Sequence, residues 1–221
     1  MLDSLREDVC AIAKRSQAEG LCANKAGNFS VLDSDSWLVV ITPSGVDRET
    51  LTPRDLVIID LYANVVENFS DLKPSSEALM HLAIYATRPD TRAVVHTHSL
   101  YGTTFALMNR PIPALVYEAA SMGLTQARIP VAPYARPGTL ELAANVVDAC
   151  KESECFLLEK HGAVTFDTVS IAEAYRKAVY LEEMAHLYYN ALTLGQGAEP
   201  PCISQDELSA WKYPDHIKLG G

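Results

Sequence analysis

The chain has 221 residues, of which 48% are hydrophobic and 21% are charged, an ordinary composition for a globular protein with a sizeable core. Its formal net charge of -10 disfavours nucleic acid and anionic membranes as partners, although a local basic pocket for a phosphate is compatible with it. No apolar run approaches the roughly 20 residues of a membrane span, so we expect no membrane partner.

The cysteines and the N-terminal segment indicate the compartment. The five cysteines are odd in number and scattered, and none forms a Cys-x-x-Cys motif. We therefore expect reduced, mostly buried thiols rather than a disulfide framework. Residues 1–8 carry acids and no apolar core, unlike a secretion signal. Both features favour a cytoplasmic protein.

The first half of the chain mixes helical and strand patterns. Apolar residues recur at helical spacing from the start of the chain, which predicts an amphipathic helix that ends near Gly20. A polar tight turn is expected over 42–45, and a helix over 77–87 that stops before a proline. Runs of β-branched and aromatic residues predict strands over 28–32, 37–41, 56–60 and 63–67.

The second half continues this mixture. We expect strands over 92–98, 155–158 and 163–166, helices over 100–107 and 140–150, and a proline-rich loop over 130–137. A capping box from Ser170 to Glu173 opens a long helix that runs to about residue 194. No repeat or long linker divides the chain. We therefore expect one α/β or α+β domain over 1–221, with a mobile C-terminal tail from about 195 that docks through Trp211 and Tyr213.

Two histidines at the end of an apolar strand are the most informative feature. In Ala93-Val94-Val95-His96-Thr97-His98-Ser99, His96 and His98 lie two residues apart. Side chains alternate along a strand, so both imidazoles face the same way. Such a pair is half of a metal site, although two hydrogen-bonded imidazoles in a polar pocket would give the same pattern.

Two further residues complete a metal-binding set. Glu77 follows a pair of serines, and His161 precedes a glycine, where backbone and metal can approach closely. Three histidines and a carboxylate suit tetrahedral zinc, and the carboxylate can leave the metal to act as a base. His81, one helical turn after Glu77, is a possible ligand that we interpret instead as a supporting or core histidine. The set points to a metal-dependent enzyme.

Three polar turns form a second candidate site. They contain Gly27-Asn28, Ser44-Gly45 and Ser75-Ser76, and each offers backbone N–H groups or hydroxyls. The paired serines precede a helix, whose N-terminus attracts an anion. Together with Lys25 the turns could cradle a phosphate. The simpler alternative is that they are ordinary turns and a helix N-cap, since these residue types dominate both.

Five short motifs of the sequence together resemble those of a known family. Gly27-Asn28-x-Ser30, Thr42-Pro43-Ser44-Gly45, Pro74-Ser75-Ser76-Glu77, His96-Thr97-His98 and His161-Gly162 occur in the order and approximate spacing of the class II aldolase/adducin family. The similarity covers nearly all of the chain except the tail. The resemblance implies a three-layer domain with a central, mainly antiparallel sheet flanked by helices. It also implies a homotetramer with active sites between subunits.

The resemblance assigns roles to individual residues. It makes His96, His98 and His161 zinc ligands, and it makes Glu77 the fourth ligand in the empty enzyme and the catalytic acid/base once substrate binds. Tyr117 resembles a catalytic tyrosine that reaches in from a neighbouring subunit, and Tyr213 is related to a second tyrosine of the family. The substrate phosphate is expected at Asn28, Ser44, Gly45, Ser75 and Ser76.

Function follows from the same resemblance. It implies a zinc-dependent aldolase that cleaves a ketose 1-phosphate, such as L-fuculose 1-phosphate or a related deoxy sugar phosphate, to dihydroxyacetone phosphate and a small aldehyde. The alternatives are an L-ribulose-5-phosphate 4-epimerase, a sugar-acid phosphate decarboxylase and a metal-free adducin-type binding module. Two departures concern the sugar: Lys25 replaces a small hydroxyl residue, and Pro137 replaces an aromatic residue.

Overall fold

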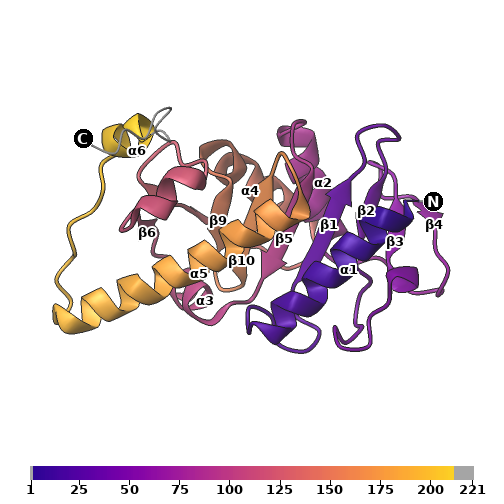
Figure 1. Ribbon diagram of the computed structural model, residues 1–221, viewed down its shortest axis with the longest axis horizontal. Helices are drawn as coiled ribbons and strands as arrows, with labels where there is room; N and C mark the ends of the chain where they lie inside the picture. Colours follow the sequence, from indigo (N-terminus) through magenta and orange to yellow (C-terminus); the bar gives the residue numbers. More distant parts are fainter. Residues whose placement is uncertain (1, 212–221) are drawn as a thin grey trace, which may run out of the picture.

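The computed structural model describes residues 2–211, which form layers around one large sheet (Figure 1). The large sheet contains β1 (Asn28–Leu32), β2 (Val39–Ile41), β3 (Val57–Ile59), β4 (Val65–Glu67), β5 (Ala93–Thr97), β8 (Val131–Ala132), β9 (Cys155–Leu158) and β10 (Gly162–Asp167). A small second sheet pairs β6 (Ile112–Pro113) with β7 (Arg128–Ile129). The helices are α1 (Asp3–Ala18), η1 (Pro53–Asp55), α2 (Ala78–Thr87), α3 (Leu100–Leu107), η2 (Tyr117–Ser121), α4 (Leu140–Glu152), α5 (Ile171–Leu194) and α6 (Gln205–Ala210).

The large sheet is almost entirely antiparallel. Its strand order is β4-β3-β2-β1-β5-β10-β9-β8, and only β8 and β9 run parallel to each other. β1, β5 and β10 are therefore neighbours at the centre of the sheet. The expected mainly antiparallel sheet between helices is confirmed.

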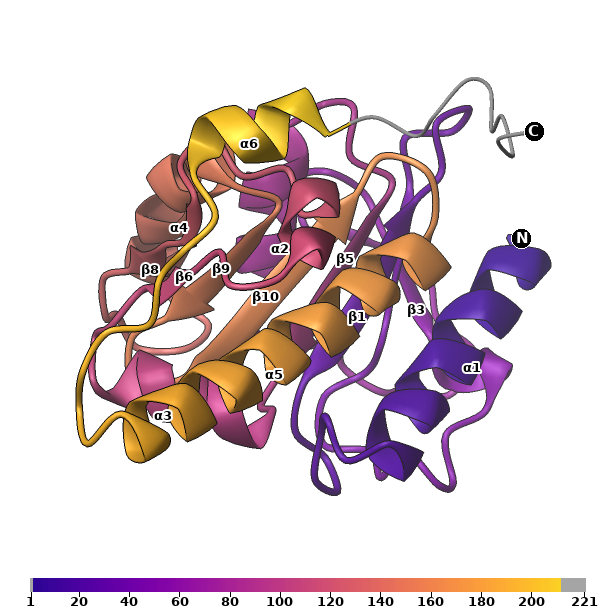
Figure 2. The same ribbon diagram turned by 60° about the vertical axis from the view of Figure 1, so that its left-hand side comes forward.

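Helices cover both faces of the sheet. α1 and α5 lie side by side across one face, and α2 and α4 cover the other (Figures 1 and 2). The alternation along β5 shows how the strand serves both layers. Ala93 and Val95 pack on the α1 and α5 side, whereas Val94 packs on the α2 and α4 side. The same period of two places His96 on the α2 side.

One short strand corrects the sequence prediction. The expected loop over 130–137 contains β8, whose Val131 and Ala132 pair in parallel with Leu157 and Leu158. A strand of two residues has no measurable side-chain period, and the prolines around it favour a loop assignment. Tertiary pairing with β9 decides the backbone conformation there.

The C-terminal segment packs on the domain through residues 203–208. The Ile203 N–H donates to the Ala114 carbonyl at 2.8 Å, and Leu208 is buried. α6 therefore lies against η2, the short helix that begins with Tyr117. Trp211 is half exposed, with its ring centroid 6.4 Å from that of Tyr117. Tyr213 lies outside the described residues.

The expected state of the cysteines is confirmed. All five are free thiols; Cys202 is exposed, and the buried ones are Cys10, Cys22, Cys150 and Cys155. Within residues 2–211, no helix is both long enough and apolar enough to cross a bilayer.

Candidate active site

The three central strands bring the candidate metal ligands together. Asn28 on β1 lies directly across from His96 on β5, and His96 in turn pairs with Val164 on β10. His98 follows β5 by one residue and faces the same way as His96, with their Nε2 atoms 3.0 Å apart. The side-chain alternation therefore places the two imidazoles on one face, as predicted from their spacing.

His161 reaches this pair from the turn between β9 and β10. Its ring centroid lies 4.7 Å from that of His96 and 5.0 Å from that of His98. The turn can approach so closely because Gly162 follows. A Cβ atom on Gly162 would lie 2.3 Å from the Thr97 carbonyl oxygen and 3.2 Å from His98 Cδ2. Any larger residue there would push His161 away from the other two histidines.

Glu77 completes the cluster from the start of α2. It is 6% exposed, and the Ser75 hydroxyl accepts a hydrogen bond from its backbone N–H at 3.2 Å. Its two carboxylate oxygens contact different partners. Oε2 lies 3.2 Å from His96 Nε2 and accepts a hydrogen bond from Asn28 Nδ2 at 2.7 Å. Oε1 lies 3.2 Å from His161 Nε2.

This donor set fits a divalent metal ion. One ligand atom from each of Glu77, His96, His98 and His161 lies within 4.8 Å of all the others. His96 Nδ1 is hydrogen bonded to the Ala163 carbonyl at 2.9 Å, so this nitrogen is the donor and Nε2 turns its lone pair toward the cluster. Glu77 Oε1 is buried and has no hydrogen-bond partner within the described part of the chain. The imidazole nitrogens and the carboxylate therefore converge on one point, which is what a metal site requires.

The protonation states suit metal binding. Burial, followed by the proximity of the His96 and His161 imidazoles, lowers the pKa of His98 to about 3. Burial, followed by His96, lowers the pKa of His161 to about 4. Burial opposes the ionisation of Glu77, but His96, His161 and the Asn28 amide together hold its pKa well below the usual range. At neutral pH, His98 and His161 are therefore neutral and Glu77 is ionised, the forms in which these side chains bind metals.

The predicted phosphate turns line one pocket beside the cluster. Its volume is about 290 Å³. Two backbone hydrogen bonds hold the turns together: Ser44 N–H donates to the Lys73 carbonyl, and Ser75 N–H donates to the Thr42 carbonyl. Both metal-cluster and turn residues contribute to the pocket wall, namely Lys25, Asn28, Ser44, Gly45, Arg48, Ser75, Ser76, Glu77, His98, Pro137 and His161. The structure thus places every sequence-predicted phosphate residue at one cavity.

Asn28 differs from the other turn residues in what its side chain does. Its amide N–H donates to Glu77, and its carbonyl oxygen is hydrogen bonded to His81 Nε2. The Asn28 side chain is therefore held against the Glu77 carboxylate. His81 is fully buried behind Asn28 and does not belong to the metal cluster, in agreement with its interpretation as a supporting histidine.

Arg48 was not predicted from the sequence. Its side chain is 2% exposed, lines the pocket, and donates to the Gly27 and Lys25 carbonyls. It therefore fixes the turn that precedes Asn28 and adds positive charge beside the pocket. An arginine in a polar turn usually points into solvent. In the sequence, Arg48 is marked only by its position three residues after Gly45. That spacing does not show whether the side chain is buried or points into solvent.

Tyr117 lies apart from this pocket. It is 63% exposed on η2, beside Trp211, and it is absent from the described residues that line the pocket. His186 is also outside the site and stacks on Tyr101, with ring centroids 3.9 Å apart.

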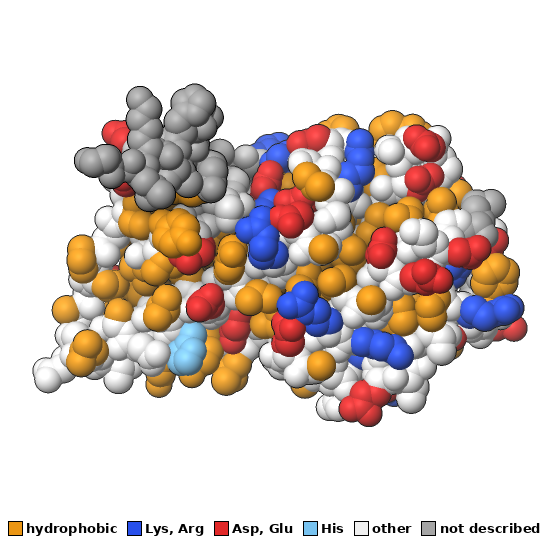
Figure 3. Space-filling view, viewed as in Figure 1, with side chains coloured by type: hydrophobic (Ala, Val, Ile, Leu, Met, Phe, Trp, Pro, Cys, Tyr) orange, Lys and Arg blue, Asp and Glu red, His pale blue; other side chains and the backbone are white. Residues whose placement is uncertain are grey.

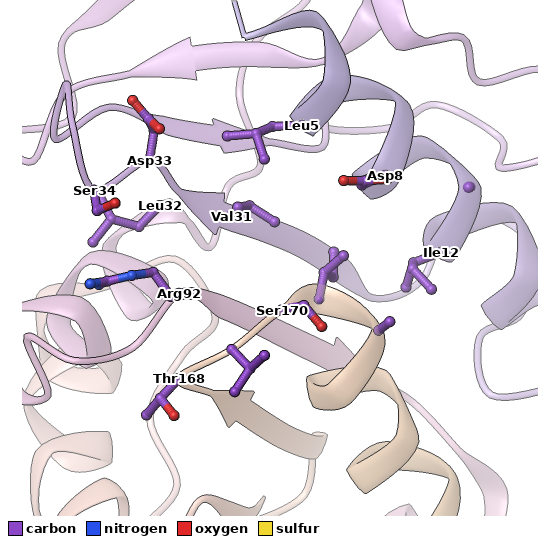
Figure 4. Close-up of a pocket in the computed structure, with 14 residues that line it drawn as sticks. Leu5, Asp8, Ile12, Val31, Leu32, Asp33, Ser34, Arg92, Thr168 and Ser170 are labelled. Atoms are coloured by element: carbon purple, nitrogen blue, oxygen red, sulfur yellow. The ribbon is translucent and has the colours of Figure 1, made fainter.

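A larger cavity of about 680 Å³ lies on the other side of the sheet (Figure 4). Aliphatic side chains such as Ile12 and Val31 line it, with Asp33 and Arg92 among its few charged groups. Arg92 precedes β5, whereas His96 and His98 lie at the end of that strand. This cavity is therefore at the opposite end of β5 from the metal cluster.

Comparison with known proteins agrees with the site. The sequence pattern of the class II aldolase and adducin N-terminal domain matches residues 7–189. A 5-deoxy-D-ribulose 1-phosphate aldolase from Bacillus thuringiensis is 34% identical over 208 residues, which cover 94% of this chain and 93% of the relative. An L-fuculose phosphate aldolase from Escherichia coli O157:H7 is 39% identical over 190 residues, covering 86% of this chain and 84% of the relative. A solved structure of an L-fuculose 1-phosphate aldolase superposes with a TM-score of 0.86 at 33% identity, covering 93% of each chain.

The chain therefore belongs to the class II aldolase and adducin family. Within that family it is an enzyme, a class II aldolase of the fuculose-phosphate and deoxyribulose-phosphate aldolase type.

The metal cluster leads to the first prediction. His96→Ala and His161→Ala each remove one imidazole from a set of four ligands, so both variants should lose most of the divalent metal that the wild type holds. Metal content of the purified proteins, measured by elemental analysis, provides the test. His186→Ala is the matched control, because it removes an imidazole that stacks on Tyr101 away from the cluster. Full metal occupancy in both cluster variants would place the metal elsewhere.

Proposed function

We propose that this enzyme cleaves a ketose 1-phosphate, either L-fuculose 1-phosphate or a related deoxy sugar phosphate, to dihydroxyacetone phosphate and a small aldehyde. The observation that carries the proposal is the position of Glu77. One carboxylate oxygen faces the histidines, and the same side chain lines the pocket formed by the polar turns. A single group can therefore serve the metal site and also reach a substrate in the pocket.

We infer that the metal is zinc, held by His96, His98 and His161 with Glu77 as the fourth ligand. Three imidazoles and one carboxylate are a common zinc donor set. When bound, the metal supplies Lewis-acid stabilisation of the negative charge that develops on the ketone side of the substrate.

The proton transfers fall to the side chains. Cleavage breaks the bond between C3 and C4, and the C4 hydroxyl loses its proton as the aldehyde forms. The electron pair remains on C3, which becomes an enediolate carbon and must be protonated. We assign the protonation of C3 to Glu77, because this side chain contacts the histidine cluster and also lines the pocket. We assign the proton exchange at the aldehyde oxygen to Tyr117 of a neighbouring subunit.

The phosphate is assigned to the turns. Ser44, Ser75 and Ser76 offer hydroxyls, Gly45 offers an N–H, and the Asn28 region closes the pocket. Ser75 and Ser76 also precede α2, where backbone N–H groups attract anions. Lys25 and the buried Arg48 add positive charge on the same wall. An acidic protein can therefore bind a phosphate here, because the local positive charge and the hydrogen-bond donors attract the phosphate despite the negative net charge of the chain.

A homotetramer is part of the proposal, with its active sites between subunits. Figure 3 shows hydrophobic side chains exposed around α3 and the C-terminal half of α5. The exposed residues there include Leu100, Leu107, Met108, Leu187, Tyr189 and Leu194. Apolar surface of this kind marks contact sites between proteins. A subunit contact would also give the exposed Tyr117 a substrate to act on. We further propose that the enzyme works in the cytoplasm.

The role of Glu77 gives the second prediction. Glu77→Gln keeps the shape of the side chain and the three histidines, so most of the metal should remain bound. Loss of the acid/base should lower kcat by roughly 100- to 10,000-fold. Steady-state kinetics with elemental analysis measures both quantities. Glu159→Gln is the control, because that carboxylate is only two residues from His161 but is bonded to Tyr134 and Lys160. A Glu77→Gln enzyme with normal turnover would remove Glu77 from the mechanism.

The phosphate pocket gives the third prediction. Ser76→Asp places a negative charge on the pocket wall, and Ser76 is exposed, so the substitution should not disturb folding. The KM for L-fuculose 1-phosphate, or for whichever sugar phosphate is used, should rise by about 10-fold or more, equivalent to at least ~1.4 kcal/mol. Ser34→Asp makes the same charge change at the distant cavity and should leave KM unchanged. Equal efficiency of the wild type on L-fuculose and L-fuculose 1-phosphate would show that these turns do not read a phosphate.

A further inference from the structure

A buried row of polar side chains runs from Glu77 into the protein, away from the pocket. Asn28 Nδ2 donates to Glu77 Oε2 at 2.7 Å, and the other end of the Asn28 amide meets His81 Nε2. On the far side of the ring, His81 Nδ1 lies 2.7 Å from Ser30 Oγ, which in turn lies 2.7 Å from the Tyr85 hydroxyl. Asn28, Ser30, His81 and Tyr85 are at most 5% exposed. The row is therefore buried, and its Asn28 end borders the pocket.

Two secondary-structure periods build this row. Asn28 and Ser30 are two residues apart on β1, so both side chains point toward α2. His81 and Tyr85 are four residues apart on α2, so they lie one above the other on the helix face that meets β1. The hydrogen bonds pass back and forth between strand and helix. Neither the strand nor the helix could form the row alone.

Each hydrogen bond in the row has only one possible direction. The ionised Glu77 carboxylate can only accept, so Asn28 presents its NH₂ group to Glu77 and its carbonyl oxygen to His81. His81 Nε2 must therefore carry the proton, which leaves Nδ1 as an acceptor. Ser30 donates its hydroxyl proton to Nδ1, and Tyr85 donates to Ser30. Reversing any one group would set two acceptors or two donors against each other in a buried site.

We propose that Tyr85, Ser30 and His81 are positioning residues that hold the Asn28 amide in one orientation and thereby orient the Glu77 carboxylate for proton transfer. The inference rests on the proposed function, in which Glu77 is the acid/base. An unrestrained Asn28 amide could rotate and turn its carbonyl oxygen toward the carboxylate. Repulsion would then move Glu77, which also lies 3.2 Å from His96 and from His161. Small displacements of a catalytic group have large effects on rate.

A positioning role and a merely structural role predict different kinetics. Ser30→Ala removes the hydroxyl that donates to His81 Nδ1, so the ring and the Asn28 amide lose their fixed direction. We expect kcat to fall by about 10- to 100-fold while KM and metal content stay within about twofold of the wild type. Tyr85→Phe should have a smaller effect, because Ser30 can still donate to His81. In the Glu77→Gln background, Ser30→Ala should cause no further loss, since the row acts through Glu77.

Ser153→Ala is the matched control. Ser153 is 1% exposed and uses its hydroxyl in two hydrogen bonds with the backbone of Cys155. It precedes β9, whereas His161 follows that strand, so it is at the opposite end of the sheet from the site. Its loss should lower thermal stability without lowering kcat. An equal fall of kcat in Ser153→Ala and Ser30→Ala, or an additive loss in the Glu77→Gln background, would overturn the positioning role.

The tautomer of His81 can be tested without any substrate. Histidine-selective ¹⁵N NMR of the wild type should show His81 as the neutral form with its proton on Nε2, and Ser30→Ala should remove this preference. His96 should show the opposite tautomer, because its Nδ1 is bonded to the Ala163 carbonyl. A His81 proton on Nδ1 in the wild type would overturn the inference. A protein with the expected tautomer that cleaves no sugar phosphate would instead count against the proposed function and leave the oriented row standing.

Discussion

The site depends on the burial of one carboxylate among three imidazoles. Glu77 is 6% exposed, and taking an ionised carboxylate out of water is costly unless partners of opposite polarity surround it. The Asn28 amide donates one hydrogen bond to this carboxylate. The other close neighbours of its oxygen atoms are the ring nitrogens of His96 and His161. A divalent cation in the cluster would satisfy the remaining lone pairs. The same side chain also lines the pocket, which is why we propose it for proton transfer.

The antiparallel sheet is what makes this burial possible. β1, β5 and β10 are neighbours. Asn28, His96 and the turn of His161 are far apart in the sequence, but they therefore lie together at one end of the central strands. Close approach of that turn requires a residue without a side chain at Gly162. α2 covers the same face and contributes both Glu77, at its start, and His81, on its inner surface. Fold and site are therefore built by the same contacts.

Much of this arrangement was predictable from residue spacing, and the exceptions have a common cause. The period of two in His96-Thr97-His98 fixes a shared face, and the spacing of Glu77 and His81 fixes a shared side of one helix. Those inferences depend only on local geometry. β8, by contrast, exists because it pairs with β9, and Arg48 is buried because the turn of Gly27 folds over it. Ser30 and Tyr85 matter through partners on another element. A contact between two distant segments leaves no periodic pattern in the sequence of either segment.

The most direct measurement is product analysis of the metal-loaded enzyme on a panel of phosphorylated ketoses. L-Fuculose 1-phosphate, 5-deoxyribulose 1-phosphate and 5-methylthioribulose 1-phosphate test the aldehyde side, while L-ribulose 5-phosphate tests for epimerisation. We predict that at least one 1-phosphate releases dihydroxyacetone phosphate with its matching aldehyde. Chelation should abolish the release, and added zinc should restore it. Epimerised product without cleavage, or cleavage that survives complete removal of metal, would contradict the account.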